Sequence, residues 1–148
     1  MLRLSRKTLL ALEAVIDIAY TSAPQPVQAK EITARQGVPH RYLEQVMQQL
    51  VRAGILNGVR GPRGGYRLAR ERKRISVGDV VRVAQSIDEN EETFDGGSEL
   101  GKRVVVPLMA SLQDGVMAKL DAISIEEICS RARATGLDCG PGAADFAL

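Results

Sequence analysis

The sequence predicts a mainly α-helical fold with one small β-hairpin, and three features of its 148 residues indicate this class. Apolar residues recur every three or four positions in several segments, which is the spacing of a helix with one buried face. One short stretch is crowded with glycine and lies between extended segments, which is typical of a tight hairpin. Hydrophobic residues make up 45% and charged residues 26% of the chain, so it can bury a core.

Three helices are expected in the first third of the chain. The first spans about 5–21, because Ser5 is a good N-cap and apolar residues follow it at helical spacing. A short second helix spans about 28–36 and a third spans 39–53, and a glycine directly follows each of them. The expected buried face of the third helix consists of Leu43, Val46, Met47 and Leu50.

A basic, glycine-rich hairpin is expected after the third helix. Short extended segments at 55–57 and 66–69 flank the turn sequence GVRGPRGG at 58–65. Two helices joined by a tight turn and followed by such a hairpin form a winged helix-turn-helix, in which the hairpin is the wing.

A fourth helix completes the first predicted domain, which covers residues 1–86. It spans about 76–85 and opens with Ser76 as its cap and Asp79 three residues later, the pattern of a capping box. The next segment, 87–101, holds six acidic residues and no basic residue, and it is rich in glycine. That composition predicts an acidic loop.

A long amphipathic helix is expected at about 102–123, with Pro107 in its first turn or at its true start. Its apolar stripe is too large to stay exposed, so a second copy of the chain is expected to cover it; the alternative is that it packs on its own domain. A shorter helix capped by Ser124 completes a dimerisation region at 102–135, and the tail at 136–148 is expected to be flexible. The predicted dimer interface residues are Val105, Leu108, Met109, Leu112, Val116 and Leu120.

Charge is divided unevenly along the chain. Residues 1–82 carry 15 Lys and Arg residues against 6 acidic residues, whereas residues 83–148 carry 5 against 12. A basic first half indicates a polyanionic partner, and the alternative is that the two oppositely charged parts bind each other. Five scattered aromatic residues provide no stacking platform for RNA, so double-stranded DNA is the predicted partner.

The predicted DNA contacts lie at the start of the third helix and in the wing. The second helix of a helix-turn-helix enters the major groove, where side chains such as Gln and Glu discriminate between base edges. Arginines on a narrow hairpin suit the minor groove, where the negative potential is strongest over A·T-rich sequence. The alternative is that these side chains are simply solvated. The candidate residues are His40, Arg41, Glu44, Gln45, Arg60, Arg63, Gly64, Gly65, Tyr66 and Arg67.

Few residues are suited to catalysis or metal binding. The chain has one histidine, His40, and two cysteines, Cys129 and Cys139, whose spacing matches no zinc pattern. No P-loop, HExxH or dinucleotide-binding motif is present, so no catalytic residue, metal or cofactor is expected. Cys129 is interpreted as a small core residue, with a redox sensor as the alternative. The longest apolar run, 104–110, is far short of the ~20 residues of a membrane span, so a cytoplasmic protein is expected.

Three stretches of the sequence resemble a known family, the Rrf-two family of bacterial transcription regulators. The stretches are YLEQVMQQLVRAGIL at 42–56, VRGPRGGYRLAR at 59–70 and ISVGDVVRVAQ at 75–85. The resemblance runs from about residue 4 to 131, and it implies a dimeric winged-helix DNA-binding protein with the long helix as the dimer interface. It also implies that Glu44, Gln45 and Arg60 contact DNA.

The chain departs from the family's pattern in one respect. Iron–sulfur members hold their cluster with three cysteines in the loop before the long helix, whereas the corresponding segment here, 87–101, has no cysteine. Carboxylates are poor replacements for three thiolates, so no cluster of the usual kind is expected. The predicted function is a dimeric regulator, a repressor that occludes a palindromic operator and responds to an unidentified small molecule or regulatory protein. The alternative is a protein-interaction module that no longer reads DNA.

Overall fold

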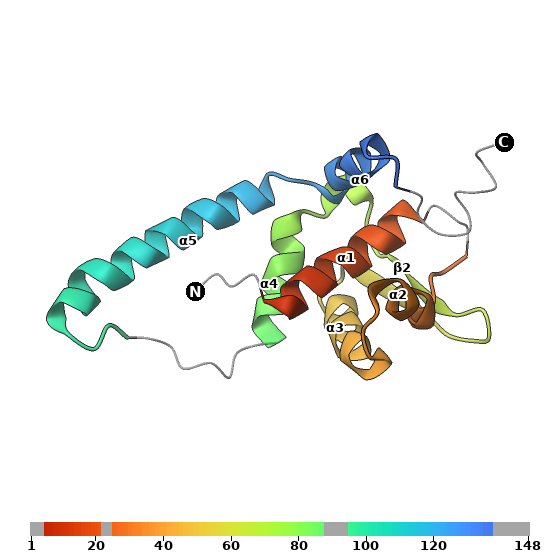
Figure 1. Cartoon of the computed structure of the whole chain (residues 1–148), viewed down its shortest axis with the longest axis horizontal. Coiled ribbons are helices and arrows are strands. Elements are labelled where there is room, and N and C mark those ends of the chain that lie inside the picture. Colours follow the sequence, from red (N-terminus) through yellow and green to blue (C-terminus); the bar gives the residue numbers. More distant parts are fainter. Residues whose placement is uncertain (1–4, 22–24, 88–94, 138–148) are drawn as a thin grey trace.

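The computed structural model describes residues 5–21, 25–87 and 95–137. Within these ranges the chain forms six α-helices and one two-stranded antiparallel sheet (Figure 1). The predicted class, mainly α-helical with a small hairpin, is confirmed. The elements are α1 (Arg6–Tyr20), α2 (Ala29–Gln36), α3 (His40–Arg52), β1 (Leu56–Val59), β2 (Gly65–Leu68), a short 3-10 helix η1 (Arg72–Arg74), α4 (Val77–Ile87), a π-helical turn η2 (Gly101–Val105), α5 (Val106–Asp121) and α6 (Ile125–Ala134).

The helix starts depend on the capping side chains that the sequence indicates. The hydroxyl of Ser5 accepts a hydrogen bond from an amide in the first turn of α1 at 3.3 Å, and Ser124 caps α6 in the same way. Before α4, the side chains of Ser76 and Asp79 each accept a bond from the other residue's amide at 3.0 Å, which is the predicted capping box. Pro39 has an extended backbone and is the N-cap of α3, whereas the sequence analysis placed it inside the helix.

The core lies where α1 packs against α3, α4 and α6, and it is aliphatic. The predicted inner face of α3 is confirmed, because Leu43, Val46, Met47 and Leu50 are all buried. Each fully buried side chain of this kind contributes about 1.5–3 kcal/mol relative to an exposed one. Among the largest buried side chains outside α3 are Val15, Ile32, Ile55, Leu56, Ile75, Val80, Val81 and Ile125.

The wing consists of β1, β2 and the turn between them. The two strands pair from Leu56 opposite Leu68 to Val59 opposite Gly65. The strands therefore begin one residue later at β1 and one residue earlier at β2 than the sequence predicts, because the pairing register sets their ends. Tyr66 also bridges to Val27, with backbone hydrogen bonds of 3.0 and 2.8 Å, and this bridge ties the base of the wing to the segment before α2.

The long helix begins earlier than predicted. The chain is already helical at residue 99, and the wide turn η2 leads directly into α5. At the end of that turn the Val106 amide donates to the carbonyl of Gly101, five residues back instead of four. Pro107 has no amide hydrogen, so the usual four-residue ladder cannot run through it. The last three residues of the predicted loop 87–101 are therefore helical in the structure.

The long helix also ends sooner than predicted. It stops at Asp121, because Ile123 leaves the helix and its carbonyl accepts a hydrogen bond of 2.8 Å from the Val77 amide. Residues 88–94 of the predicted acidic loop and the tail 138–148 lie outside the described residues, so the flexibility expected for the tail stays a prediction. No helix in the described part of the chain has both the length and the apolar character that a membrane crossing needs.

Candidate nucleic-acid interface

The outer face of α3 presents polar side chains at its N-terminal end. Its inner face is fixed in the core, so the opposite face must point away from the body of the protein. His40, Arg41, Glu44 and Gln45 are all exposed, and their spacing of one and four positions places them together over the first two turns. The structure therefore gathers the four predicted residues of this helix on one accessible surface.

The wing carries the second group of predicted contacts. Arg60 and Arg63 lie in the exposed turn between β1 and β2, and Arg67 is exposed on β2. Among the described residues, neither Arg60 nor Arg63 forms an ion pair with an acidic side chain. Their guanidinium groups are therefore available for a phosphate or a base edge.

A shallow, open hollow of about 530 Å³ connects α3 to the wing. Lys30 from α2, His40 from α3 and Arg60 from the wing all line it. Lys30 was not among the residues predicted to contact DNA, nor was Gln28, which also lines the hollow. The signal that could have found Lys30 is its place in the first turn of the helix before the recognition helix, since that helix crosses the DNA backbone in this motif.

Gly64, Gly65 and Tyr66 shape the wing. A Cβ atom at Gly64 would overlap the carbonyl oxygen of Val59, and one at Gly65 would overlap that of Val27. Tyr66 is half-buried against the core, and burial raises the pKa of its phenol, with the nearby Glu44 carboxylate adding to the effect. The base of the wing lies beside the recognition helix, because β1 packs against α3. For these three residues, direct contact with DNA stays a prediction.

Five exposed apolar residues between positions 100 and 116 recur at a spacing of four residues. Leu108 and Leu112 are each 55% exposed and Val116 is 39% exposed, so no described residue of the chain covers them. Leu100 and Val104 extend this row at the same four-residue spacing, and neither was among the predicted interface residues. Leu100 precedes the predicted helix start at 102, whereas Val104 lies within the predicted helix. Of the other predicted interface residues, Val105 is exposed, Met109 is half-buried, and Leu120 packs partly on the core of its own chain. We call the residues Leu100, Val104, Leu108, Leu112 and Val116 the apolar row.

Cys129 lies on the inner side of α6 and is fully buried. Burial raises the pKa of its thiol, so the less reactive protonated form predominates at neutral pH. This environment supports the interpretation of Cys129 as a core residue. In the described part of the chain, no group of three or more His, Cys, Asp or Glu side chains could hold a metal ion.

Comparison with known proteins identifies the family. The model of the Rrf2 (Rrf-two) family, described as an iron-dependent transcriptional regulator, matches residues 4–131. The chain belongs to the Rrf2 family. The transcriptional regulator IscR of Xenorhabdus nematophila is 36% identical over 129 residues, which cover 86% of this chain and 79% of that protein. The IscR protein of Escherichia coli K12 is 34% identical, with coverages of 86% and 80%.

Solved structures of Rrf2 relatives have the same fold. The structure of IscR from T. potens has a TM-score of 0.72 and 31% identity, and it covers 94% of both chains. The structure of CymR, the global cysteine regulator of B. subtilis, has a TM-score of 0.70 and 30% identity, and it covers 88% of this chain and 98% of that one. These relatives are transcriptional regulators, so the resemblance inferred from the sequence and the prediction that the chain is not an enzyme are both confirmed.

Proposed function

We propose that this Rrf2-family regulator binds a specific palindromic operator on double-stranded DNA as a homodimer. The observation that supports it best is the hollow beside α3, where the start of the recognition helix and an arginine of the wing lie on one accessible surface. A recognition helix in the major groove and a wing in the neighbouring minor groove would together read a half-site. Repression by occlusion of a promoter, in the cytoplasm of a bacterium, belongs to the same proposal.

The proposed dimer forms through the apolar row. An uncovered stripe of five large apolar side chains is unusual for a monomer, and a second copy related by a two-fold axis would bury it against itself. Such a dimer would present two copies of the winged domain to one duplex, with half-sites separated by about one helical turn or a multiple of it. The division into a DNA-binding domain at 1–86 and a dimerisation region at 102–135 is part of this proposal.

Selection of bound fragments from genomic DNA by the purified full-length protein tests the function. The expected result is enrichment of fragments that share one inverted repeat, and binding of that repeat far more tightly than of random DNA, by about a thousand-fold or more. A protein that enriches no sequence would contradict the proposal and favour the protein-interaction module. Fluorescence anisotropy with a synthetic operator and with a scrambled duplex at the same salt concentration gives the ratio.

Arg60→Ala is expected to cost about 1–3 kcal/mol of binding free energy on the selected operator and less on scrambled DNA, because a wing arginine in the minor groove senses sequence-dependent groove width. Anisotropy titrations of both duplexes measure the two losses. Arg131→Ala is a matched control, because Arg131 is an exposed arginine of α6, far in sequence from the wing. Equal losses on the two duplexes would make Arg60 a phosphate contact without a role in specificity.

We propose that the regulator works without an iron–sulfur cluster of the usual kind. The family description names iron dependence, and iron–sulfur clusters are held mainly by cysteine thiolates. The whole chain has two cysteines, one of them the buried Cys129 and the other Cys139, outside the described residues. This donor set does not fit a cluster, so a small molecule or a regulatory protein is the proposed signal.

Protein purified without oxygen is therefore expected to be colourless. Visible absorption spectroscopy and assays of bound iron and sulfide measure the result directly. A brown preparation with visible absorption and with stoichiometric iron and sulfide would overturn the proposal, and the double substitution of Cys129 and Cys139 by serine would then identify the ligands.

A further inference from the structure

Among the described residues, the α5 helix packs against the core of the winged domain near its C-terminal end. None of its residues is buried, and the side chains that pack partly against the core are Met117 and Leu120, followed by Ile123 after the helix. Figure 1 shows α5 extending away from the rest of the molecule as an arm. The direction of this arm is therefore set by the contacts at one end, which we call the joint.

One part of the joint is a backbone seam. The Val77 amide donates to the carbonyl of Ile123 and the Ile125 amide donates to that of Ile75, both at 2.8 Å. Ser76 and Ser124 face each other between these bonds as an antiparallel bridge. The seam fixes one short line of contact between the winged domain and the end of the arm. Because the contact is a line, the seam alone does not prevent rotation of α5 about it, and side-chain contacts at the joint must restrain that rotation.

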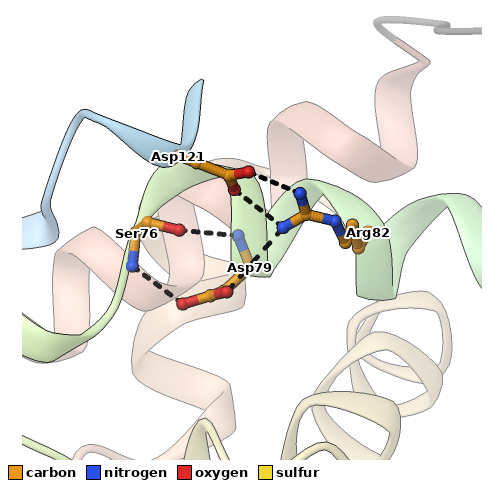
Figure 2. A network of polar contacts seen from close by, with 4 residues as sticks. All are labelled: Ser76, Asp79, Arg82 and Asp121. Atoms are coloured by element: carbon orange, nitrogen blue, oxygen red, sulfur yellow. Dashed lines mark hydrogen bonds and ion pairs between the residues drawn. The ribbon is translucent and has the colours of Figure 1, made fainter. Parts of the chain in front are cut away.

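The second part of the joint is a side-chain clamp between Arg82 of α4 and Asp121, the last residue of α5 (Figure 2). The Arg82 Nη1 atom donates to Asp121 Oδ1 at 2.7 Å, and Nη2 donates to Oδ2. Two parallel bonds between a planar guanidinium and a carboxylate fix orientation as well as distance. Hydrogen bonding to Arg82 lowers the pKa of Asp121, so its carboxylate is ionised at neutral pH. Asp79, already held by Ser76 in the capping box, lies 3.9 Å from the Nη1 atom of Arg82, which also bonds Asp121.

Gly78 allows the carboxylate to sit where it does. A Cβ atom at this position would overlap Asp121 Oδ1 and would lie 3.1 Å from the Asp121 backbone nitrogen. The absence of a side chain lets the end of α5 approach the first turn of α4, where a negative charge is also favoured by the helix dipole. The clamp therefore depends on Gly78 and Arg82 of α4 and on Asp121 of α5, which is 39 positions after Arg82.

We propose that the Arg82–Asp121 clamp is a positioning contact that sets the angle between the winged domain and the dimerisation arm, and thereby the operator spacing that the dimer accepts. This inference rests on the proposed function, a DNA-binding dimer joined through α5. A swing of about 10° at the joint moves the far end of a 16-residue helix, about 24 Å long, by about 4 Å, roughly one base-pair step. A small change of angle would therefore shift one recognition helix relative to the other by about the length of one base-pair step.

A contribution to stability alone is the competing explanation of the clamp. The side chains of Arg82 and Asp121 are 51% and 40% exposed, and ion pairs of such exposure contribute little to stability. The bidentate geometry fixes the orientation of Asp121 relative to Arg82, and it thereby restrains the rotation of α5 about the seam. The two explanations differ in measurement, because lost stability lowers affinity for every operator alike, whereas a loosened angle changes the preference among spacings.

The test uses the full-length protein and its selected operator, rebuilt with one or two base pairs added to or removed from the centre. Wild type is expected to lose about ten-fold or more in affinity for each one-base-pair change, whereas Arg82→Ala and Asp121→Asn lose less than about three-fold. Both variants are expected to stay dimeric by sedimentation and to bind a single half-site as wild type does. Arg131→Ala breaks an exposed ion pair with Glu127 within α6, and it is expected to keep the wild-type profile.

Gly78→Ala is a second variant that leaves both charges in place and should also raise the helix propensity of α4. It is expected to flatten the spacing profile like Arg82→Ala, with no loss of thermal stability. If the affinity of Arg82→Ala and Gly78→Ala depends on operator spacing as steeply as that of wild type, the inference is overturned but the proposed function is not. The same holds if both variants lose affinity equally for every operator and have a lower melting temperature. A wild-type protein that tolerates every spacing would overturn it too, and one that selects no operator would overturn the proposed function and this inference with it.

Discussion

Leu112→Glu is expected to convert the dimer into a monomer and to weaken binding to the palindromic operator by about a hundred-fold or more. Leu112 lies within the apolar row and is 55% exposed in the single chain, so the proposed dimer would bury it against the same surface of a second copy. A glutamate there would place one carboxylate from each copy in an apolar interface without a partner, which is costly. The monomer keeps one winged domain and so loses the gain from binding two linked half-sites.

Sedimentation velocity measures the mass, and anisotropy with a full operator and a half-site measures the two affinities. The half-site affinity is expected to stay near that of wild type, because Leu112 is not among the residues predicted to contact DNA. Ala110→Glu is the matched control, since Ala110 is exposed on the opposite side of α5 from Leu112 and glutamate is a good helix former. An unchanged mass for Leu112→Glu would place the dimer interface elsewhere.

Features that depend on neighbouring residues could be predicted from the sequence. The capping box of Ser76 and Asp79 needs only a hydroxyl and a carboxylate three positions apart at a helix start, so the local order of residues determines it. The same holds for the inner face of α3, where helical periodicity alone identifies Leu43 and Leu50 as buried. The exposed face with Glu44 and Gln45 can then be predicted as well, because it lies opposite the buried face of the same helix.

Features that depend on how the elements pack could not be predicted. Arg82 and Asp121 are 39 positions apart, and they meet only because the end of α5 returns to the first turn of α4. The hollow lined by Lys30, His40 and Arg60 likewise forms from three separate elements. Only two of them, the third helix and the wing, were predicted to contact DNA. Periodicity and capping patterns describe one segment at a time, so they do not predict which segments contact each other in the folded chain.

The start of the long helix was missed for another physical reason. Glycine and acidic residues before Lys102 have the composition of a loop, and Pro107 is a helix-breaking residue in most positions. The wide turn η2 accommodates this proline by shifting the hydrogen bonds to a five-residue spacing. Leu100 thereby joins the apolar row ahead of Val104, which makes the surface available to a second copy longer than the sequence indicates.

Gly64→Ala is expected to weaken operator binding by about ten-fold or more while lowering the free energy of unfolding by only about 1–3 kcal/mol. The turn of the wing is closed by a hydrogen bond of 2.9 Å from the Gly64 amide to the carbonyl of Gly61. A Cβ atom at Gly64 would overlap the Val59 carbonyl oxygen and would lie 2.9 Å from that of Gly61, so backbone on both sides of the turn must move. Arg60 and Arg63 are carried by this backbone, and their guanidinium groups would no longer fit one groove together.

Gly58→Ala separates this effect from the general consequence of replacing glycine in the wing. Gly58 lies on β1, and a Cβ atom there would have no neighbour within 4 Å, so its variant is expected to bind the operator within about two-fold of wild type. Anisotropy titrations measure the affinities and thermal unfolding followed by circular dichroism measures the stabilities. If the two variants bind the operator equally well, the shape of the wing turn does not matter to recognition, and the arginines act only as charges. A loss of affinity for Gly64→Ala alone, with the melting temperatures of both variants well above the temperature of the binding assay, would mean that the turn must hold Arg60 and Arg63 in one geometry.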